Sequence, residues 1–400
     1  MAFEVFKFDD LATLINGRAY LMPELQDSGK YRIVRVGNFS GKDEWFWSDM
    51  ELEEDKYCEA GDLLYKWACN FGPEIWKEEK VIYHYHIWKV LPKKGKVDKM
   101  FLYYYLQYAT PMWLGGTNGT TMVHITKANM EKKKVFIPSS VSEQKLIASV
   151  LTKYDELIEN NENRIKCLEE MANSLYKEWF IRFRFPGHEI TRMDNGIPFG
   201  WEYKKFSNLY DFSRGVSYST EEIECEDGIN LINLKNIASF GGFRRDGTKK
   251  YDGKYKKDQV VKYKDLVMGV TDMTQDRRTV GAVALVPDIS GVISADLIKL
   301  NSSLDNVFSY CLFKYGFYSK LVSQFGNGAN VIHLKPSSIK NQKILIPTKD
   351  IIEKFVSLVT PTIDEIEKLN TQNDILLKQR DALLPRLMSG KLSVEGKEIV

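Results

Sequence analysis

Apolar residues recur at every seventh position in two long stretches, and this is the clearest pattern along the chain. The first stretch contains Ile147, Tyr154, Asn161, Leu168 and Leu175. The second contains Val356, Ile363, Asn370, Leu377 and Leu384. A seven-residue period is typical of the seam of a coiled coil, so we expect two long helices that pair with each other.

Each stretch also carries a second apolar stripe. In the first stretch this stripe is Leu151, Ile158, Ile165, Ala172 and Trp179, and in the second it is Ile352, Val359, Ile366 and Leu387 around the polar Asn373 and Arg380. Each helix could instead pack only on its own globular domain, but the shared register favours pairing. Pro361 is expected to kink or restart the second helix near Thr360 and leave its first turn as a separate piece, because proline lacks a backbone N–H.

Shorter runs with alternating apolar and polar residues lie outside these stretches. Examples are Tyr31 to Val36, Val81 to Val90 and Val280 to Val286, which are separated by Gly, Asp and Asn. Alternation with a period of two predicts strands, and the separating residues predict turns. The remaining segments are therefore expected to form strand-rich domains with a few helices.

The chain contains an internal repeat that sets its organisation. Residues 118–125 align with 327–334, and 134–138 align with 343–347, both at an offset of 209 residues that continues into the heptad stretches. A weaker repeat at an offset of 198 pairs Phe8 with Phe206, Leu11 with Leu209, Gly17 with Gly215 and Tyr20 with Tyr218. The expected fold class is α+β: two strand-rich domains, residues 1–138 and 186–347, separated by helical regions 139–185 and 348–400 that form an antiparallel coiled coil, with a pseudo-two-fold internal repeat.

The composition of the chain indicates its cellular environment more clearly than the reaction or ligand it is suited to. The five cysteines show no zinc or redox spacing, which suits reduced thiols in the cytoplasm, and we expect neither a targeting peptide nor a membrane span. A formal net charge of only +2 argues against a protein that neutralises many phosphates alone. The charge is uneven, however, because Arg244 to Asp265 holds nine Lys or Arg against four Asp.

The sequence offers little catalytic chemistry. It has neither the Asn/Asp-Pro-Pro-Tyr/Phe motif of an amino-methyltransferase nor a phosphate-binding loop ending in Gly-Lys-Ser/Thr. Gly326-Asn327-Gly328 is better explained as a turn than as a cofactor loop. Asp364 to Lys368 carries carboxylates and a lysine such as nucleases use, but on a helix it is expected to be a solvated charged face.

Two pairs of histidines each have two possible roles. His84 and His86 would face one side of an aromatic strand, where strand packing is favoured over metal binding because suitably spaced carboxylate or Cys ligands are missing. His124 and His333 occupy equivalent places in the repeat. We expect them to make a shared structural hydrogen bond, with a phosphate contact as the alternative.

Several segments resemble one known family, the specificity subunits of type I restriction-modification systems, across essentially the whole chain. Ile137-Pro138, Glu143 to Ala148 and Leu175 to Phe180 look like the central conserved region of that family. Leu383 to Leu392 looks like its distal conserved region, and Pro198-Phe199-Gly200-Trp201 resembles the usual opening of a recognition domain. Two departures affect local geometry: the first domain lacks this opening, and Pro361 interrupts the second helix.

The resemblance implies a non-catalytic DNA-reading subunit. Each strand-rich domain would be a target-recognition domain that reads one half of a bipartite target in double-stranded DNA, with the helices setting the gap. Two methyltransferase subunits would dock on exposed faces of Ser142 to Phe180 and Ile351 to Leu392, including Trp179 and Phe180, and motor-nuclease subunits would complete the complex. S-adenosylmethionine, ATP and Mg²⁺ would belong to these partners. The alternatives are an orphan scaffold without an active complex and a relative of single-chain restriction-modification enzymes.

Candidate DNA contacts are polar residues in segments that differ between the copies, because such side chains pair with base edges and phosphates. No catalytic or metal-binding residue is expected. In the first domain the candidates are Arg18, Tyr20, Arg35, Asn38 and Lys66, and in the second they are Tyr218, Asn233, Lys235, Asn236, Arg244, Arg245, Gln275, Arg277 and Arg278. A phosphate-contact cluster is predicted at Lys249, Lys250, Lys254, Lys256 and Lys257, interleaved with Tyr251 and Tyr255, with a solvated hairpin as the alternative.

Overall fold

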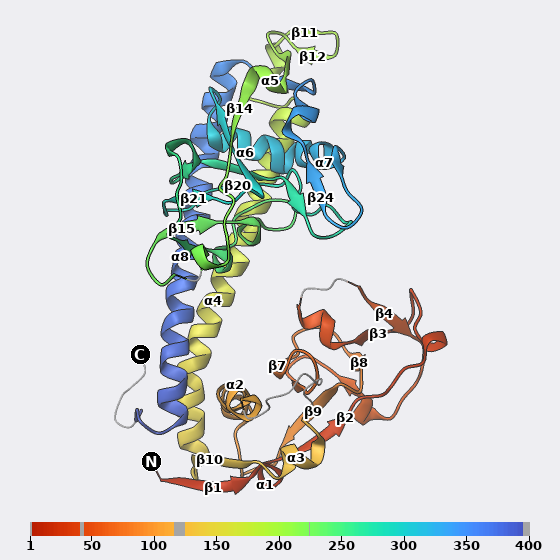
Figure 1. Cartoon of the computed structure of the whole chain (residues 1–400). Coiled ribbons are helices and arrows are strands. Elements are labelled where there is room, and N and C mark those ends of the chain that lie inside the picture. The colour runs from red at the N-terminus through yellow and green to blue at the C-terminus, as the bar shows by residue number, and fades with distance from the viewer. Residues whose placement is uncertain (1, 41–43, 116–124, 224, 395–400) are drawn as a thin grey trace. The chain divides into compact units, whose positions relative to one another are not determined.

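The computed structural model describes residues 2–40, 44–115, 125–223 and 225–394 of the chain. It divides into two compact units, one formed by Met1–Asn160 with Gln372–Val400 and the other by Asn161–Thr371. Each unit holds one strand-rich domain and one part of each of two long helices, α4 (Val141–Tyr176) and α8 (Lys349–Met388) (Figure 1).

Two four-stranded sheets form the strand-rich domain of the first unit. One has the order β2 (Ala12–Asn16), β9 (Ile87–Pro92), β6 (Leu63–Lys66) and β7 (Gly72–Ile75), with all neighbours antiparallel. The other has the order β4 (Phe46–Ser48), β3 (Tyr31–Val34), β8 (Val81–Tyr83) and β5 (Tyr57–Cys58), in which β3 and β8 are parallel. A separate pair joins β1 (Phe3–Lys7) to β10 (Lys134–Pro138), and the helices are α1 (Phe8–Leu11), α2 (Lys99–Leu114) and α3 (Lys127–Glu131).

Local sequence signals explain how α2 starts and where it packs. The Asp98 carboxylate accepts hydrogen bonds from the backbone N–H groups of Met100 and Phe101, each at 3.0 Å, which satisfies two amides of the first turn. Phe101 is fully buried and belongs to the same core cluster as Phe8 and Leu151 of α4. The start of α4 is therefore part of the core of the first unit.

The second unit repeats this plan. Its sheets have the orders β14 (Tyr210–Arg214), β22 (Leu297–Ser302), β18 (Leu266–Gly269), β20 (Val283–Leu285), and β16 (Lys249–Tyr251), β15 (Ile229–Ile232), β21 (Gly291–Ile293), β17 (Val260–Val261). Strand β13 (Glu202–Lys205) pairs with β25 (Lys343–Ile346), and the helices are α5 (Phe206–Leu209), α6 (Asn306–Tyr315) and α7 (Tyr318–Ser323). Additional elements are the hairpin β11 (Met193–Asp194) and β12 (Ile197–Pro198), and the sheet β19 (Thr271–Asp272), β24 (Ile332–Leu334), β23 (Gly326–Asn327).

The internal repeat is confirmed by the matching topology and by glycines at equivalent places. Gly17 and Gly215 each precede a parallel β-bridge, Arg18 to His84 in the first unit and Val216 to Ser294 in the second. A Cβ atom at Gly17 would lie 2.4 Å from a backbone oxygen, and one at Gly215 would lie 2.0 Å from one. Glycine is required at both positions because the backbones approach too closely for a side chain.

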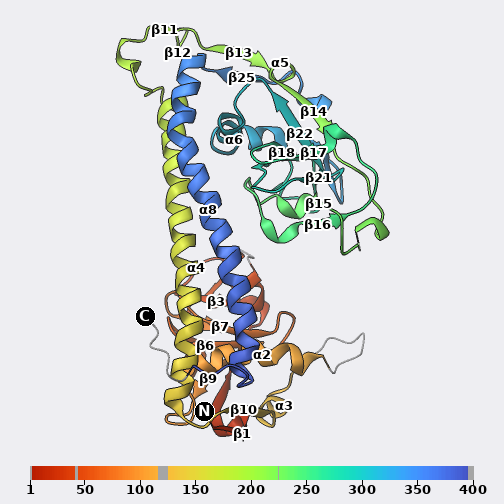
Figure 2. The same cartoon turned by 90° about the vertical axis from the view of Figure 1, so that its left-hand side faces the viewer.

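Helices α4 and α8 pair in antiparallel fashion, as the heptad pattern predicts. In the second unit, Arg164 bonds to Glu365 at 2.9 Å, and the ring of Tyr176 lies 6.0 Å from that of Phe355. In the first unit, Arg380 bonds to Asp155 at 2.6 Å. Within each unit the two helices lie side by side in both views (Figures 1 and 2).

The helices pack on the strand-rich domains as well as on each other. Phe355 is fully buried in the core of the second unit but lies outside both predicted stripes, whereas Leu377 of the predicted seam is 37% exposed. Pairing of the two helices and packing of each helix on a globular domain, which the sequence offered as alternatives, therefore both occur in the structure. A seven-residue period identifies the paired faces but not the third face, which a globular domain covers.

The predicted restart of the helix at Pro361, with a separate first turn, is wrong. Helix α8 continues without interruption from Lys349 to Met388, and Pro361 lies inside it on an exposed position. The buried residues Phe355, Val359 and Leu369 hold the helix on both sides of the proline. We attribute the continuity to this packing, which outweighs the loss of one backbone hydrogen bond. The Thr360 hydroxyl is buried there and finds no hydrogen-bond partner in the described part of the chain.

The expectation that Trp179 and Phe180 belong to an exposed docking face is also wrong. Both side chains are buried, at 5% and 7% exposure, in the π-helical segment Lys177–Ile181 that directly follows α4. Their rings lie 5.7 Å and 4.8 Å from that of Phe355. These aromatic residues therefore belong to the core of the second unit.

Candidate nucleic-acid interface

Two of the predicted contacts in the first unit are occupied by internal partners. Lys66 is 4% exposed and bonds to Glu74 at 2.6 Å, so its ammonium group does not reach the surface. The Arg18 guanidinium bonds to Glu24 at 2.6 Å and lies 5.1 Å above the ring of Tyr20. Burial raises the pKa of Tyr20, and its hydroxyl has no hydrogen-bond partner among the residues that the structure describes. Burial thus contradicts a base-reading role for Lys66.

Arg35 and Asn38 line a pocket of about 470 Å³ together with Asn70, His84 and His86. The Asn38 carboxamide oxygen accepts from the backbone N–H of Arg35 at 2.8 Å, which fixes the turn that carries both residues. The exposed Arg35 guanidinium lies 5.0 Å above the ring of Phe46. Arginine, asparagine and histidine side chains at one pocket provide donors and acceptors suited to base edges.

His84 and His86 lie in the turn between β8 and β9 rather than in one continuous strand. Burial, together with the neighbouring His86 and Arg35, lowers the pKa of His84 to about 4. Its imidazole is therefore neutral near pH 7. The described residues contain no group of three His, Cys, Asp or Glu side chains placed to hold a metal ion.

An aromatic cluster beside this pocket was not identified from the sequence. The Trp67 ring lies 5.9 Å from the ring of Tyr85 and 5.0 Å from that of His86, and Tyr85 is 37% exposed. The signal was the density of aromatic residues between Tyr83 and Trp88. The sequence could not show that Trp67 joins these aromatic residues, because Trp67 comes from the end of another strand.

Two predicted base readers of the second unit organise their own loop instead. Asn233 and Asn236 are 6% and 0% exposed. The Asn233 amide donates to the Gly247 carbonyl at 2.7 Å, and the Asn236 amide donates to the Arg244 carbonyl at 2.8 Å. Their burial contradicts direct base contact, because every polar group of a buried amide is needed internally.

The loop that these asparagines hold places several cations on the surface. The exposed members among the candidates are Lys235, Arg244, Lys249, Lys250 and Lys254, and Lys256 and Lys257 are exposed as well. Tyr251 is buried, and its hydroxyl donates to the Lys254 carbonyl at 3.0 Å, whereas Tyr255 is 48% exposed. The lysines are accessible to phosphates, but Tyr251 is part of the support beneath them. Tyr218 is half-buried in the cluster that contains Tyr251.

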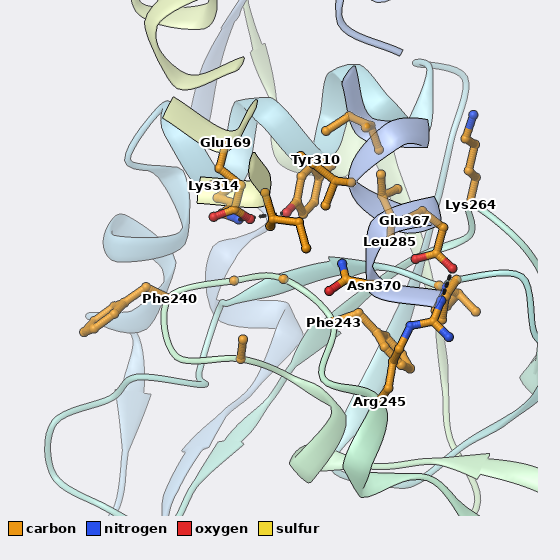
Figure 3. Close-up of a pocket in the computed structure, with 18 of the residues that line it drawn as sticks. Glu169, Phe240, Phe243, Arg245, Lys264, Leu285, Tyr310, Lys314, Glu367 and Asn370 are labelled. Atoms are coloured by element: carbon orange, nitrogen blue, oxygen red, sulfur yellow. Dashed lines mark hydrogen bonds and ion pairs between the residues drawn. The ribbon is translucent and has the colours of Figure 1, made fainter. Parts of the chain in front are cut away.

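Arg245 is bound to helix α8 within the second unit. Its guanidinium forms an ion pair with Glu367 in a pocket of about 450 Å³ (Figure 3). Two other cations that line this pocket are paired as well: Lys264 lies 2.6 Å from Asp364, and Lys314 lies 2.7 Å from Glu169. The carboxylates of Asp364 and Glu367 are therefore half-buried partners of domain cations, not the solvated face expected from the sequence.

The remaining candidates lie in one loop of the second unit. Gln275 donates to the Ala329 carbonyl at 2.5 Å, and Arg277 donates to the Ser323 carbonyl at 3.3 Å. Arg278 is exposed and lies 2.8 Å from Asp276. The sequence thus located this loop, in which the Gln275 and Arg277 side chains bond to backbone carbonyls while Arg278 pairs with another exposed side chain.

Further sequence-based expectations concern the repeated histidines, the segment Gly326 to Gly328 and membrane spans. His333 is exposed in β24 and its ring makes no hydrogen bond among the described residues, so the expected structural bond is wrong there; His124 lies outside the described residues. Gly326 and Asn327 form β23, and the turn begins at Gly328, which has a φ of +151°. None of the helices in the described part of the chain combines the length and apolar character needed to cross a bilayer.

Comparison with known proteins identifies a single family. A profile of the type I restriction modification DNA specificity domain matches residues 2–170. The MjaIX type I restriction enzyme specificity subunit of Methanocaldococcus jannaschii is 30% identical over 315 residues, which cover 76% of this chain and 72% of that protein. The HindI specificity subunit of Haemophilus influenzae is 21% identical over 68% of this chain and 72% of its own length. The crystal structure of an S subunit from M. genitalium matches the fold with a TM-score of 0.60 at 14% identity, over 96% of each chain.

Proposed function

Because the chain belongs to the family of type I restriction-modification specificity subunits, we propose that each strand-rich domain reads one half of a bipartite DNA target. The observation that carries this proposal is the repeated topology: the sheets recur, α2 and α6 both start at an aspartate N-cap, and equivalent strands are joined by loops of different length. Equivalent frameworks with different loops are suited to reading different sequences, because specificity resides in side chains on loops. Paired α4 and α8 would set the gap between the two half-sites.

Accessible polar groups define the reading surfaces of this proposal. In the first domain they are Arg35, Asn38 and the histidines of the pocket. In the second domain the exposed lysines on and after β16 would contact phosphates. Arg244 and Arg278 are exposed, and each forms an ion pair with a neighbouring aspartate, Asp246 at 2.7 Å and Asp276 at 2.8 Å, which base edges would have to replace. The modest net charge of +2 fits a subunit whose partners supply part of the phosphate contacts.

The exposed faces of the helices are proposed docking surfaces for two methyltransferase subunits. In the first unit Leu157 and Ile375 are 54% and 50% exposed, and in the second unit Met171 and Leu358 are 62% and 55% exposed. Large apolar side chains exposed on helices are suited to contacts with partner helices. S-adenosylmethionine, ATP and Mg²⁺ would be bound by the methyltransferase and motor-nuclease partners in the cytoplasm, and adenine would be the methylated base.

The proposal is tested by mapping adenine methylation genome-wide in cells that express this chain together with its methyltransferase. Cells that express either protein alone are the control. A bipartite methylated motif that requires both proteins is the expected result. If the two proteins form a complex but produce no such motif, the DNA-reading role is wrong and the chain is a scaffold.

A further inference from the structure

One hairpin differs between the two copies in a way that adds a structured loop. Strands β6 and β7 of the first unit are separated by residues 67–71, whereas the equivalent strands β18 and β20 are separated by residues 270–282. The longer connection contains β19, which pairs with β24 of the three-stranded sheet. The second domain therefore carries an ordered insertion at a position where its counterpart has a short turn.

A single buried carboxylate closes this loop. Asp272 is 4% exposed, and its Oδ1 accepts from the backbone N–H and the hydroxyl of Thr274, both at 2.8 Å. Its Oδ2 accepts from the backbone N–H of Thr279 at 2.7 Å, and the Thr279 hydroxyl, with one hydrogen to donate, lies 2.8 Å from both this oxygen and the Thr271 carbonyl. These bonds lower the pKa of Asp272 although burial alone would raise it. The carboxylate thus fastens both ends of the segment between Thr274 and Thr279.

The segment between the two threonines is held further by its own side chains. Gln275 and Arg277 donate to the carbonyls of Ala329 and Ser323, in neighbouring segments of the same unit. Arg277 also has a φ of +53°, a conformation that a non-glycine residue keeps only where its surroundings hold it. The loop is therefore preorganised, and preorganisation reduces the entropy lost on binding.

Two charged side chains on this fastened loop remain accessible. Arg278 and Asp276 are 45% and 58% exposed and lie 2.8 Å apart. An exposed ion pair of this kind contributes little to stability, so stability does not account for its rigid support. A guanidinium donates to O6 and N7 of guanine, and a carboxylate accepts from N4 of cytosine. Side by side, the two groups match the major-groove edge of a G·C base pair.

Resting on the DNA-reading role proposed above, we infer that the loop Met273–Arg278 reads a G·C base pair in the half-site of the second domain. Arg278 and Asp276 are the base-contacting residues, and Asp272 is a positioning residue that acts through the loop. The first domain lacks this insertion, so the G·C requirement belongs to one half of the target.

The first test compares Arg278→Ala with Arg192→Ala, an exposed arginine outside the loop, in the purified complex with the methyltransferase. Binding is measured to the target and to duplexes that each carry one substituted base pair. Arg278→Ala is expected to reduce discrimination roughly 10- to 100-fold at one G·C position, and to leave the other half-site unchanged. Arg192→Ala should preserve the wild-type profile.

The second test addresses Asp272 through its partner Thr279. Thr279→Val removes the hydroxyl that lies 2.8 Å from Asp272 while preserving side-chain volume, and Thr279→Ser retains it. Thr279→Val should relax the same base-pair position as Arg278→Ala, and Thr279→Ser should restore discrimination. A merely structural role would lower stability without selecting one base pair.

The outcomes separate the inference from the proposal on which it rests. If the wild-type complex reads a bipartite target but Arg278→Ala keeps every base-pair preference, or weakens binding to all duplexes equally, the loop does not read a base. If the wild-type complex reads no bipartite target, both the proposed function and this inference fail.

Discussion

At the scale of single residues, the buried asparagines of the second unit show how polar side chains can serve recognition without contacting DNA. Asn233 and Asn236 bond to the backbone on both sides of the loop that presents Arg244. Their carboxamide oxygens accept as well, that of Asn233 from the backbone N–H of Lys235 and that of Asn236 from the backbone N–H of Asn233, both at 2.9 Å. A buried carboxamide whose N–H group and oxygen are both hydrogen-bonded within the protein holds the loop in its conformation rather than making a surface contact.

Asn236→Ala is therefore expected to destabilise the second unit by about 2 kcal/mol, because it leaves the Arg244 carbonyl and the Thr248 hydroxyl without their donor. Urea denaturation measures the change. Lys235→Ala, at the exposed neighbouring position, should change stability by less than about 0.5 kcal/mol. Equal effects of the two substitutions would contradict the structural role of Asn236.

His84 predicts a pH dependence in the first unit. Its pKa is lowered from 6.5 to about 4 in the folded state, so the unfolded chain binds a proton first as the pH falls. Stability should consequently decrease between pH 6.5 and about 4 and change no further through this group below that range. His84→Gln should have a shallower slope of unfolding free energy against pH in this window. An unchanged slope would mean that other groups cause it.

At the scale of elements, α8 shows that packing decides where a helix ends. Its proline lies in a helix that is held by buried residues before and after it. A free helix would break there, whereas this one is fixed by the core of the second unit. The lost hydrogen bond leaves the carbonyl of Ser357 without its usual helical donor.

Pro361→Ala should therefore stabilise the second unit, by about 2 kcal/mol, since it restores a backbone donor in a helix that is already continuous. The expected increase in Tm is measured by calorimetry. If the protein needed a kink at this point, the substitution would lower Tm or impair assembly with the methyltransferase.

The lysine-bearing segment around β16 gives a prediction for the complex. Replacing Lys249, Lys250 and Lys254 with alanine should weaken binding to all DNA sequences alike. The slope of log affinity against log salt concentration should become shallower by about 0.9 for each lost phosphate contact. Selective loss of one target sequence would instead assign these lysines to base recognition.

At the scale of the whole molecule, the two units are separate compact bodies with separate cores. The core of the first unit includes Phe8, Phe101 and Leu151, and that of the second includes Phe206, Phe308 and Phe355. A substitution in one core should therefore lower the stability mainly of the unit that contains it. Sites without shared partners usually contribute additively to stability.

Gly17→Ala and Gly215→Ala test this independence with equivalent changes. Each added methyl group would overlap a backbone oxygen and should cost about 3 kcal/mol in its own unit. Hydrogen exchange should show faster opening in the altered unit only, and the double variant should combine both effects. Gly115→Ala, whose Cβ would lie 3.4 Å from its nearest neighbour, is the control.

The sequence by itself determined the repeat, the two long helices and their pairing, because these depend on periodic spacing that is visible along the chain. It also identified the family and most segments that carry exposed cations. A repeat at a fixed offset can be recognised without knowing which segments contact each other in the folded protein.

Only the tertiary structure decided which candidate side chains face solvent. Lys66, Asn233 and Asn236 looked like DNA contacts but are buried, and the acidic Glu367 binds a cation of the domain. Such outcomes depend on partners far away in sequence, as with Trp67 beside Tyr85 or Arg245 paired with Glu367. A polar residue is recognisable from sequence, but whether its hydrogen bonds are satisfied within the protein depends on the packed fold.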